Sequence, residues 1–257
     1  GMVVHETYKA NGQWVSPADI RFEEQDGKRR ATLIETGEPV DIGSIEKMSK
    51  SKKNVVDPDD IIASYGADTA RWFMLSDSPP ERDVQWTEAG VEGASRFQQR
   101  VWRLVNDVVA LGEQSSETVS ENDKDALAIR KAVHRAVAGI AQDIEGLRFN
   151  RAVAQIYELT NVLAKARDGK PSGPAISALR EGVKSLIQLI NPMMPHLAES
   201  CWEALGHDGL VSDALWPEVD PTMLVDDEVT LPIQINGKRR GEITVAKAMA
   251  AADVEAL

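Results

Sequence analysis

The sequence predicts a mainly α protein: an antiparallel helical bundle with small α/β pieces at both ends. Three observations lead to this prediction. Between residues 88 and 205, apolar residues recur every three or four positions, which is the period of amphipathic helices. Residues 1–56 contain short runs typical of strands, and from about residue 228 the pattern alternates with a period of two. Strands are therefore expected at both ends and helices between them.

The first 56 residues are expected to be mostly extended. Met2-Val3-Val4 is one candidate strand, and residues 29–35 form another behind the turn-forming pair Asp26-Gly27. Turn residues follow at 36–39 and lead towards an unusually basic segment. This part of the chain is thus expected to supply a small sheet.

That basic segment is Lys47-Met48-Ser49-Lys50-Ser51-Lys52-Lys53-Asn54, with four lysines in a protein whose formal net charge is -12. Asp57-Pro58 behind it begins a helix, because proline suits the first helical position. The lysines are therefore expected on a short loop before a helix, where ammonium groups and hydroxyls can close over phosphates. Taken alone, the segment could equally be a solvated basic turn or a nuclear-import-like tract.

Helices are expected from residue 57 to residue 205. Two short ones end at Gly66 and at Ser78-Pro79-Pro80, and longer ones follow. The predicted helices cover 61–65, 69–75, 88–108, 129–146, 150–165, 176–190 and 195–205. Loops are expected at 113–124 and 168–174. Long amphipathic helices joined by short loops favour an antiparallel bundle.

The C-terminal part is expected to return to strands. Residues 229–245 predict a hairpin, because Asn236-Gly237 supplies the positive φ angles of a type I′ turn. A further helix is expected from Ala246 onwards. A hairpin and one helix bury little core by themselves. We therefore expect the chain to be cut inside its last domain.

Composition limits the class of function. An isoelectric point near 4.9 argues against indiscriminate nucleic-acid binding but allows RNA contact through local basic patches. No apolar run is long enough to span a bilayer, and no secretory pattern opens the chain. The single Cys201 excludes an internal disulfide framework and a cysteine-based zinc cluster. A buried thiol, no metal site, no membrane association and a cytoplasmic location are expected.

Lys47–Ser51 resembles the lysine-serine signature loop of class I aminoacyl-tRNA synthetases. The flanking segments are similar, in order, to the bacterial leucyl-tRNA synthetase family. These segments are Gly1-Met2-Val3-Val4 with Tyr8, Trp14-Val15-Ser16-Pro17, Asp57-Pro58, Tyr65 to Arg71, Trp86 to Ala94, Asn191 to His196 and Gln234 to Lys238. The resemblance covers nearly the whole chain. One departure is Lys53, where the family often has asparagine.

The resemblance implies a leucine–tRNA ligase, which activates leucine with ATP and transfers it to tRNA(Leu). ATP would enter with Mg as a substrate, and a monomer is implied. Lys47 and Lys50 would be catalytic, because cations near the departing pyrophosphate lower the barrier. Lys50 is the stronger candidate, since the second lysine of the family motif contacts ATP. Ser49 and Ser51 would complete the ATP-binding set, although Ser51 could equally be an ordinary turn serine.

Four parts are implied along the chain. Residues 1–56 would end the catalytic core, with a leucine-specific insertion at about 9–45 and the signature loop at 47–51. A helical connector (57–86), an anticodon-binding or tRNA-binding bundle (87–220) and a truncated C-terminal domain (221–257) would follow. The histidine motif and editing domain of the family are absent. The chain is thus expected to be a C-terminal fragment that shows no leucine-dependent ATP–pyrophosphate exchange by itself.

Eight basic residues are candidates for contact with tRNA, although each could instead be solvated or ion-paired. They are Arg96, Arg100 and Arg103 on one helical stripe, Arg148 and Arg151 around a helix start, and Lys238, Arg239 and Arg240 after the hairpin turn. Three tryptophans, Trp86, Trp102 and Trp202, could stack on bases, but their helical spacing favours the core.

Two other functions stay open at this point. One is the same portion of another class I synthetase, such as the valyl or methionyl enzyme. Residues 14–17 and 86–94 favour the leucyl family over these. The other is a free-standing RNA-binding helical module. A complete signature loop argues against that module, because a pure binding protein has no use for a pyrophosphate clamp.

Overall fold

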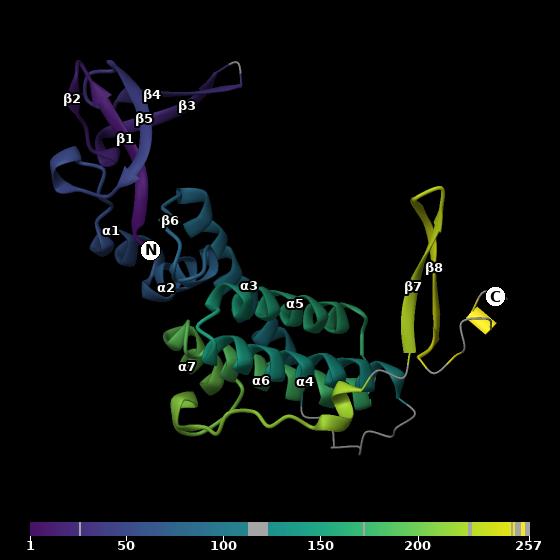
Figure 1. Ribbon diagram of the computed structural model, residues 1–257. Helices are drawn as coiled ribbons and strands as arrows, with labels where there is room; N and C mark the ends of the chain where they lie inside the picture. Colours follow the sequence, from purple (N-terminus) through teal and green to yellow (C-terminus); the bar gives the residue numbers. More distant parts are fainter. Residues whose placement is uncertain are drawn as a thin grey trace.

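The computed structural model describes residues 1–25, 27–112, 123–171, 173–225, 228–247, 249 and 253–254. Two sequence predictions fall largely outside these residues, namely the polar loop at 113–124 and the helix from Ala246 onwards. In the described part of the chain, a β-sheet and two short helices sit at one end of a helical bundle, and a hairpin extends beyond the other end (Figure 1).

The N-terminal part is a six-stranded sheet with the order β2-β1-β5-β4-β3. The sixth strand, β6, pairs with Val3 and Val4 at the start of β1. Its strands are β1 (Val3–Ala10), β2 (Gln13–Trp14), β3 (Ile20–Gln25), β4 (Lys28–Leu33), β5 (Pro39–Lys47) and β6 (Val84–Gln85). Only the β1–β6 pair is parallel among them. Tyr8, Ile20 and Val40 lie in a small core that this sheet encloses. The extended character predicted for residues 1–56 is confirmed.

Two short helices, α1 (Pro58–Tyr65) and α2 (Ala67–Ser76), connect the sheet to the bundle. The Asp57 side chain accepts a hydrogen bond from the Asp59 backbone N–H at 2.9 Å, and Pro58 occupies the first turn. Gly66 ends α1 with a φ of 85°, a conformation that favours glycine. The predicted start and end of this helix are confirmed.

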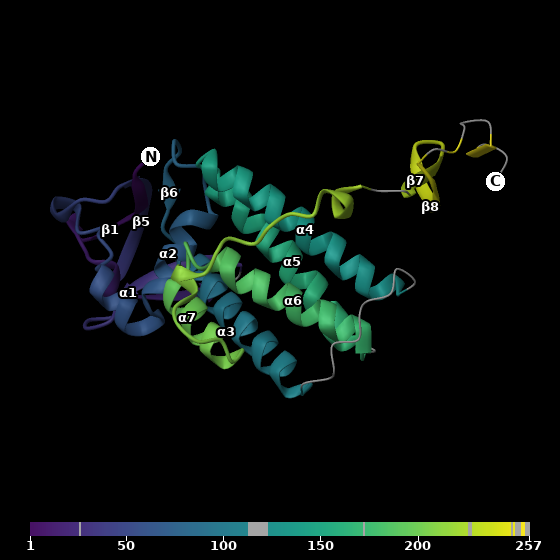
Figure 2. The same ribbon diagram turned by 90° about the horizontal axis from the view of Figure 1, so that it is seen from below.

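Five helices form the bundle, and Figure 2 shows them lying side by side. They are α3 (Glu88–Ala110), α4 (Lys124–Glu145), α5 (Phe149–Asp168), α6 (Gly173–Ile190) and α7 (Pro195–Ala204). Their apolar stripes meet in one core that also includes Trp72 of α2. The Trp72 ring stacks on Phe97 at 4.8 Å, and its Nε1 donates a hydrogen bond to Tyr157. The connector therefore packs as part of the bundle, and the antiparallel arrangement is confirmed.

The loop predicted at 168–174 extends beyond the observed loop at both ends. The helix α5 includes Asp168, and α6 already begins at Gly173. Pro174 is tolerated there because the first turn of a helix needs no backbone donor. The prediction was wrong because proline breaks a helix only in its interior, where a donor is required.

The end of α4 differs in detail from the expected glycine stop. Gly146 has a φ of -81°, and the following Leu147 takes the left-handed conformation with a φ of 56°. The Arg148 N–H donates to the Asp143 carbonyl oxygen at 2.7 Å, and the Leu147 N–H donates to Ile144 at 3.0 Å. This is the Schellman pattern, displaced by one residue from the glycine.

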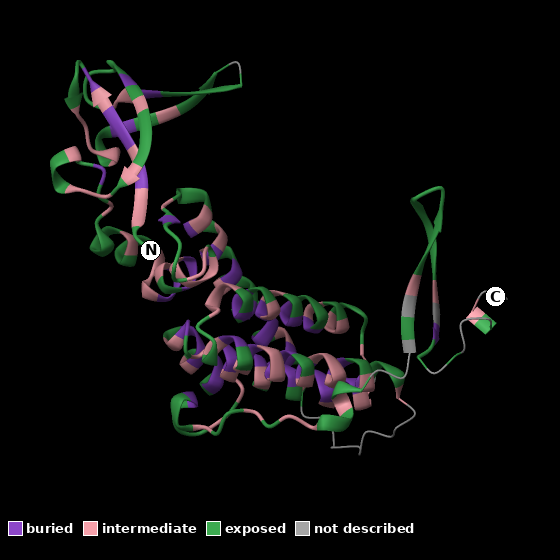
Figure 3. Ribbon diagram, viewed as in Figure 1, coloured by how far each residue is buried: buried purple, intermediate pink, exposed green. Residues whose placement is uncertain are grey.

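The C-terminal strands β7 (Glu228–Ile235) and β8 (Lys238–Ala246) form the predicted hairpin. Asn236 and Gly237 have φ values of 52° and 74°, as a type I′ turn requires. The hairpin stands apart from the bundle, and most of its described side chains are exposed (Figure 3). Two 3₁₀ turns, η3 (Val211–Asp213) and η4 (Pro221–Leu224), lie on the segment that leads to it.

Among the described residues, no helix is both long and apolar enough to cross a membrane. Cys201 lies in α7 and is fully buried. Burial raises the pKa of its thiol to about 12, so the thiolate that a nucleophile needs is suppressed. The expectation of a buried cysteine is confirmed.

Candidate functional site

The basic segment forms a tight loop between β5 and α1. Lys47 is the last residue of β5, and Lys50–Lys52 make a single 3₁₀ turn. Ser49 caps this turn, because its Oγ accepts a hydrogen bond from the Lys52 backbone N–H at 3.4 Å. Lys53 then takes a left-handed conformation with a φ of 53° and turns the chain back towards the sheet. The predicted loop before a helix is confirmed as a structure.

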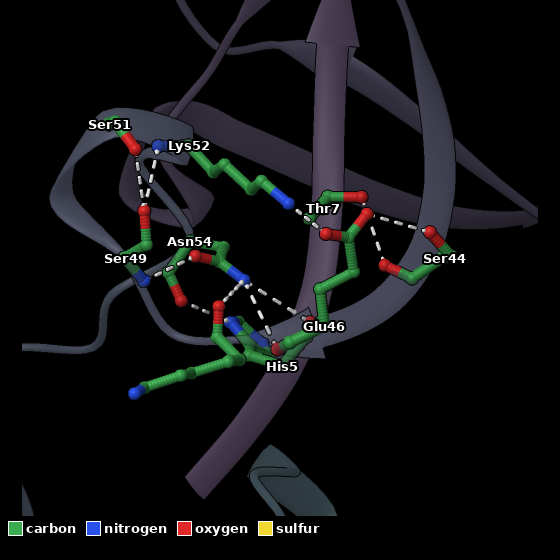
Figure 4. A network of polar contacts seen from close by, with 9 residues as sticks. His5, Thr7, Ser44, Glu46, Ser49, Ser51, Lys52 and Asn54 are labelled. Carbon is green, nitrogen blue, oxygen red and sulfur yellow. Dashed lines mark hydrogen bonds and ion pairs between the residues drawn. The ribbon is translucent and has the colours of Figure 1, made fainter.

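Asn54 anchors this loop to the sheet, and its exposed fraction is 0%. Its Oδ1 accepts a hydrogen bond from the Ser49 N–H at 2.8 Å. Its Nδ2 donates to the carbonyl oxygens of His5 on β1 and of Glu46 and Lys47 on β5, each at 3.4 Å (Figure 4). One buried amide therefore fixes the loop relative to two strands.

His5 completes the anchor from the other side. Its Nδ1 lies 3.2 Å from the Asn54 carbonyl oxygen. Burial lowers the pKa of the His5 imidazole, which favours the neutral ring with a proton on Nδ1 that can donate to this oxygen. No pattern in the sequence pointed to either role, because the partners are 49 residues apart.

The four lysines of the loop are not equivalent. Lys52 forms an ion pair with Glu46, and the hydrogen bonds from Lys52 and then Ser44 hold the pKa of the Glu46 carboxyl below its usual value. Lys47, Lys50 and Lys53 are exposed and form no ion pair within the described part of the chain. Three positive charges thus remain available to an anion, and the fourth is neutralised.

The two serines contact each other. Ser49 Oγ and Ser51 Oγ lie 2.7 Å apart, so Ser51 supports the residue that caps the 3₁₀ turn. This contact favours a role for both hydroxyls in fixing the shape of the loop. The structure therefore brings together Lys47, Ser49, Lys50 and Ser51, the predicted nucleotide-binding set, on one short segment.

The left-handed conformation of Lys53 leads to a testable expectation. An ordinary side chain at such a φ costs roughly 1–2 kcal/mol, whereas asparagine adopts it readily. Lys53→Asn should therefore leave the free energy of unfolding unchanged or raise it by up to about 1 kcal/mol. Denaturant unfolding measures this change, and a clear decrease in stability would contradict it.

A cavity of about 620 Å³ lies behind His5, between the sheet and α1. Arg29 Nη1 pairs with Glu6 Oε2 at 2.6 Å inside its wall, and Tyr8 donates to the same oxygen at 2.8 Å. Burial raises the pKa of the Tyr8 hydroxyl, so it stays protonated and can donate. Asp57, Asp60 and Glu88 also line this cavity, and such an acidic lining does not suit a phosphate.

The first group of predicted RNA contacts lies on α3. Arg100 Nη2 donates a hydrogen bond to Asn161 Oδ1 of α5 at 2.6 Å. Arg96 pairs with Glu92 at 3.4 Å, and both side chains are largely exposed. Arg103 is exposed and forms no ion pair among the described residues. The three guanidinium groups share one face of α3, as their spacing predicted.

The second group surrounds a buried carboxylate that sequence reasoning missed. Asp143 accepts from Arg148 Nε at 2.8 Å, lies 3.5 Å from Arg151 Nε, and also accepts from Gln155 Nε2 at 2.6 Å. Both arginines keep part of their side chains exposed. Their main partner is thus Asp143, which stabilises the turn between α4 and α5.

The third group lies on β8. Lys238, Arg239 and Arg240 are all exposed, and Arg239 forms an ion pair with Glu242 on the same strand. The three groups therefore occupy separate elements: α3, the turn between α4 and α5, and the hairpin.

One of the three tryptophan predictions is wrong. Trp202 is buried, and the half-buried Trp86 packs edge-on against Phe73. Trp102, in contrast, is 42% exposed. Its neighbours Val101 and Leu104 face the core of the bundle. Trp102 must then point away, because the next position along a helix is rotated by about 100°.

Comparison with known proteins places the chain among tRNA ligases. Residues 126–256 match the family model of the anticodon-binding domain of tRNA ligase, and residues 40–87 match that of class I tRNA synthetases (I, L, M and V). The chain is 60% identical over 257 residues to leucine–tRNA ligases of Brucella abortus (strain S19) and Brucella ovis. Each alignment covers 96% of this chain and 29% of the relative.

A solved structure agrees with these relatives. LeuRS of Agrobacterium radiobacter K84, in a ternary complex with tRNA and LeuAMS, matches with a TM-score of 0.68 and 28% identity. The match covers 82% of this chain and 27% of that protein. The valyl and methionyl alternatives and the free-standing RNA-binding module are not favoured by these findings. The chain, which spans 29% of the length of its Brucella relatives, therefore belongs to the family of anticodon-binding domains of tRNA ligases, preceded by a class I tRNA synthetase segment.

Proposed function

We propose that this chain is part of a cytoplasmic, monomeric leucine–tRNA ligase. The complete protein would activate leucine with ATP and Mg to leucyl-adenylate and transfer the leucyl group to tRNA(Leu). The observation that supports this most strongly is the loop at 47–54, where three lysines without ion pairs among the described residues surround a turn held by a buried asparagine. The choice of leucine follows from the Brucella relatives.

The proposed chemistry explains why the loop is cationic. A carboxylate oxygen of leucine attacks the α-phosphorus of ATP, the bond from that phosphorus to the bridging oxygen breaks, and pyrophosphate leaves with the electron pair. Negative charge grows on the leaving group, so cations held beside it stabilise the transition state more than the ground state. We assign this role to Lys50 and Lys47.

The two serines and Asn54 would hold these cations in position. Ser49 and Ser51 fix the 3₁₀ turn that carries Lys50, and Asn54 fixes the turn to the sheet. A loop fixed at its base, with mobile lysine tips, would keep the ammonium groups near the phosphates without a large rearrangement.

Amino-acid-dependent ATP–pyrophosphate exchange by the complete protein tests this proposal. We expect leucine to support exchange and valine and methionine to support it far less. Exchange that is fastest with valine or methionine would contradict the leucine assignment, and the absence of exchange with any amino acid would contradict the enzymatic proposal.

We further propose that the chain divides at the boundaries expected from its sequence. Residues 1–56 would end the catalytic core, with the insertion at about 9–45, and residues 57–86 would be the connector. Residues 87–220 would bind tRNA, and residues 221–257 would begin another domain. Trp72 of α2 packs against Phe97 of α3 and Tyr157 of α5. This packing supports a connector that holds the signature loop in a fixed position relative to the bundle.

The arginine stripe on α3 is our leading candidate for tRNA phosphate contact. Replacing Arg96, Arg100 and Arg103 by glutamine should weaken tRNA binding and flatten its dependence on salt. For each phosphate that an arginine no longer neutralises, the slope of log affinity against log salt should fall by about 0.7–0.9. Titration of the complete protein with tRNA(Leu) from low to moderate salt measures this slope.

The structure supplies a matched control for this titration. Arg130 of α4 donates two hydrogen bonds to Glu181, at 2.9 and 2.7 Å, so its charge is already balanced. Arg130→Gln should leave the slope unchanged. Parallel lines for the wild type and the α3 triple variant would show that the stripe does not meet phosphates.

A further inference from the structure

A hollow of about 370 Å³ lies between α3 and α7, next to the arginine stripe. It is lined by Gln98, Gln99, Trp102, His196, Leu197 and Ser200. An indole that is 42% exposed forms one wall, and most of the other side chains are polar. Trp102 does not contribute to the core of the bundle, because on this stretch of α3 the buried residues are its neighbours Val101 and Leu104.

The histidine of this hollow is held in a defined orientation. His196 Nδ1 lies 2.8 Å from Asp68 Oδ1, and Asp68, which is 3% exposed, also accepts from the Leu197 N–H at 2.7 Å. The carboxylate can only accept, so the Nδ1 carries the proton and the Nε2 of a neutral ring is an acceptor. The His196 side chain is 78% exposed, which leaves this acceptor open to a ligand.

Asp68 gives this arrangement its rigidity. Met194, at the start of α7, supplies no side-chain cap, and Pro195 has no N–H. The buried Asp68 of α2 caps the helix instead through the Leu197 N–H. The carboxylate of Asp68 therefore fixes both the N-terminal end of α7 and the ring of His196.

The glutamines of α3 complete the polar edge. The Gln98 amide lies 2.8 Å from Thr69 Oγ1, which also donates to the Tyr65 carbonyl oxygen at 2.8 Å, so this contact fixes the position of the amide at the edge of the hollow. Gln99 is exposed and lies four residues before Arg103, so the two side chains share a face of α3. The hollow thus offers a flat apolar surface, donors, an acceptor and an adjacent cation that forms no ion pair among the described residues.

We propose that this hollow binds an unpaired nucleobase of tRNA. The base would stack on Trp102, its edge would exchange hydrogen bonds with Gln99 and His196, and its phosphate would lie at Arg103. This combination of an aromatic platform, amide groups and cations suits single-stranded RNA, whose bases are free to stack. The inference rests on the proposed function, since it presumes that α3 faces tRNA.

Three single substitutions in the complete protein test the inference by titration with a tRNA(Leu) transcript. Trp102→Leu should weaken binding by roughly 5- to 150-fold, the range for removing one base–aromatic stack. Trp102→Phe should restore most of the affinity, because a phenyl ring also stacks. Trp216→Leu is the control, since this tryptophan lies outside the hollow and should not affect binding. None of these changes should alter the salt slope, because the arginines and their phosphate contacts stay in place.

Fluorescence gives a second measurement, which remains valid even when the Trp102→Leu variant does not fold. The difference between the wild type and Trp102→Phe isolates the emission of Trp102, and tRNA(Leu) should quench it. An unquenched difference signal, equal affinities of Trp102→Leu and wild type, or equally weakened binding by the leucine and phenylalanine variants would each overturn the stacking site. A wild type that does not bind tRNA(Leu) would instead overturn the proposed function itself.

Discussion

Lys50→Ala in the complete protein should slow leucine-dependent ATP–pyrophosphate exchange by about 10²–10³-fold, the scale of losing one preorganised group that stabilises transition-state charge. Lys50 begins the 3₁₀ turn, is exposed and has no ion pair among the described residues. Its charge is therefore free for the departing pyrophosphate. Stability should change little, because surface substitutions away from packed features usually have small effects.

Lys52→Ala is the matched control for that experiment. Lys52 lies two residues away on the same turn, but Glu46 already neutralises it. We expect a much smaller decrease in exchange for this variant. Equal decreases for the two variants would mean that the loop acts only through its total charge, and a normal rate for Lys50→Ala would remove the role assigned to this residue.

Asn54→Ala should damage both stability and activity. The substitution leaves the Ser49 N–H and three strand carbonyl oxygens without their partner, and an unsatisfied buried group costs about 1–3 kcal/mol. The free energy of unfolding should fall by about this amount. Exchange should also slow well beyond tenfold, because a misplacement of about 1 Å can cost on the order of 10²-fold.

Ser51→Ala is the control that distinguishes the contribution of the buried Asn54 amide from that of the exposed side of the 3₁₀ turn. It removes only the hydrogen bond with Ser49 Oγ at the exposed side of the loop, so we expect a much smaller change in unfolding free energy. Denaturant unfolding and exchange are measured on both variants. An Asn54→Ala protein with wild-type stability and a wild-type rate would show that the buried amide does not position the loop.

Local signals explain which parts of the fold could be predicted. Asp57-Pro58 and Gly66 set both ends of α1, because capping and positive φ depend on a few neighbouring atoms. Asn236-Gly237 set the hairpin turn for the same reason. The similar pair Asn11-Gly12, with φ values of 50° and 79°, turns β1 into β2 and was available in the sequence as well.

Other features depend on contacts between distant residues, so no local pattern contains them. Asn54 contacts a strand 49 residues earlier, and Asp68 caps a helix that starts more than a hundred residues later. The hollow at Trp102 is formed by residues of both α3 and α7, so the spacing of apolar residues on α3 alone does not reveal it. The run of lysines and hydroxyls marked this loop as a phosphate-binding candidate and family resemblance assigned the residue roles, whereas the groups that position them became visible only in three dimensions.

Charging of tRNA(Leu) by the complete protein tests the assignment to leucine–tRNA ligase most directly, because it requires both activation and transfer. Labelled leucine, valine and methionine would each be incubated with ATP and Mg and with tRNA(Leu), tRNA(Val) and tRNA(Met) in parallel. We predict that leucine accumulates on tRNA(Leu) alone. Charging of tRNA(Val) or tRNA(Met) with their own amino acids, or no charging of tRNA(Leu), would contradict the assignment.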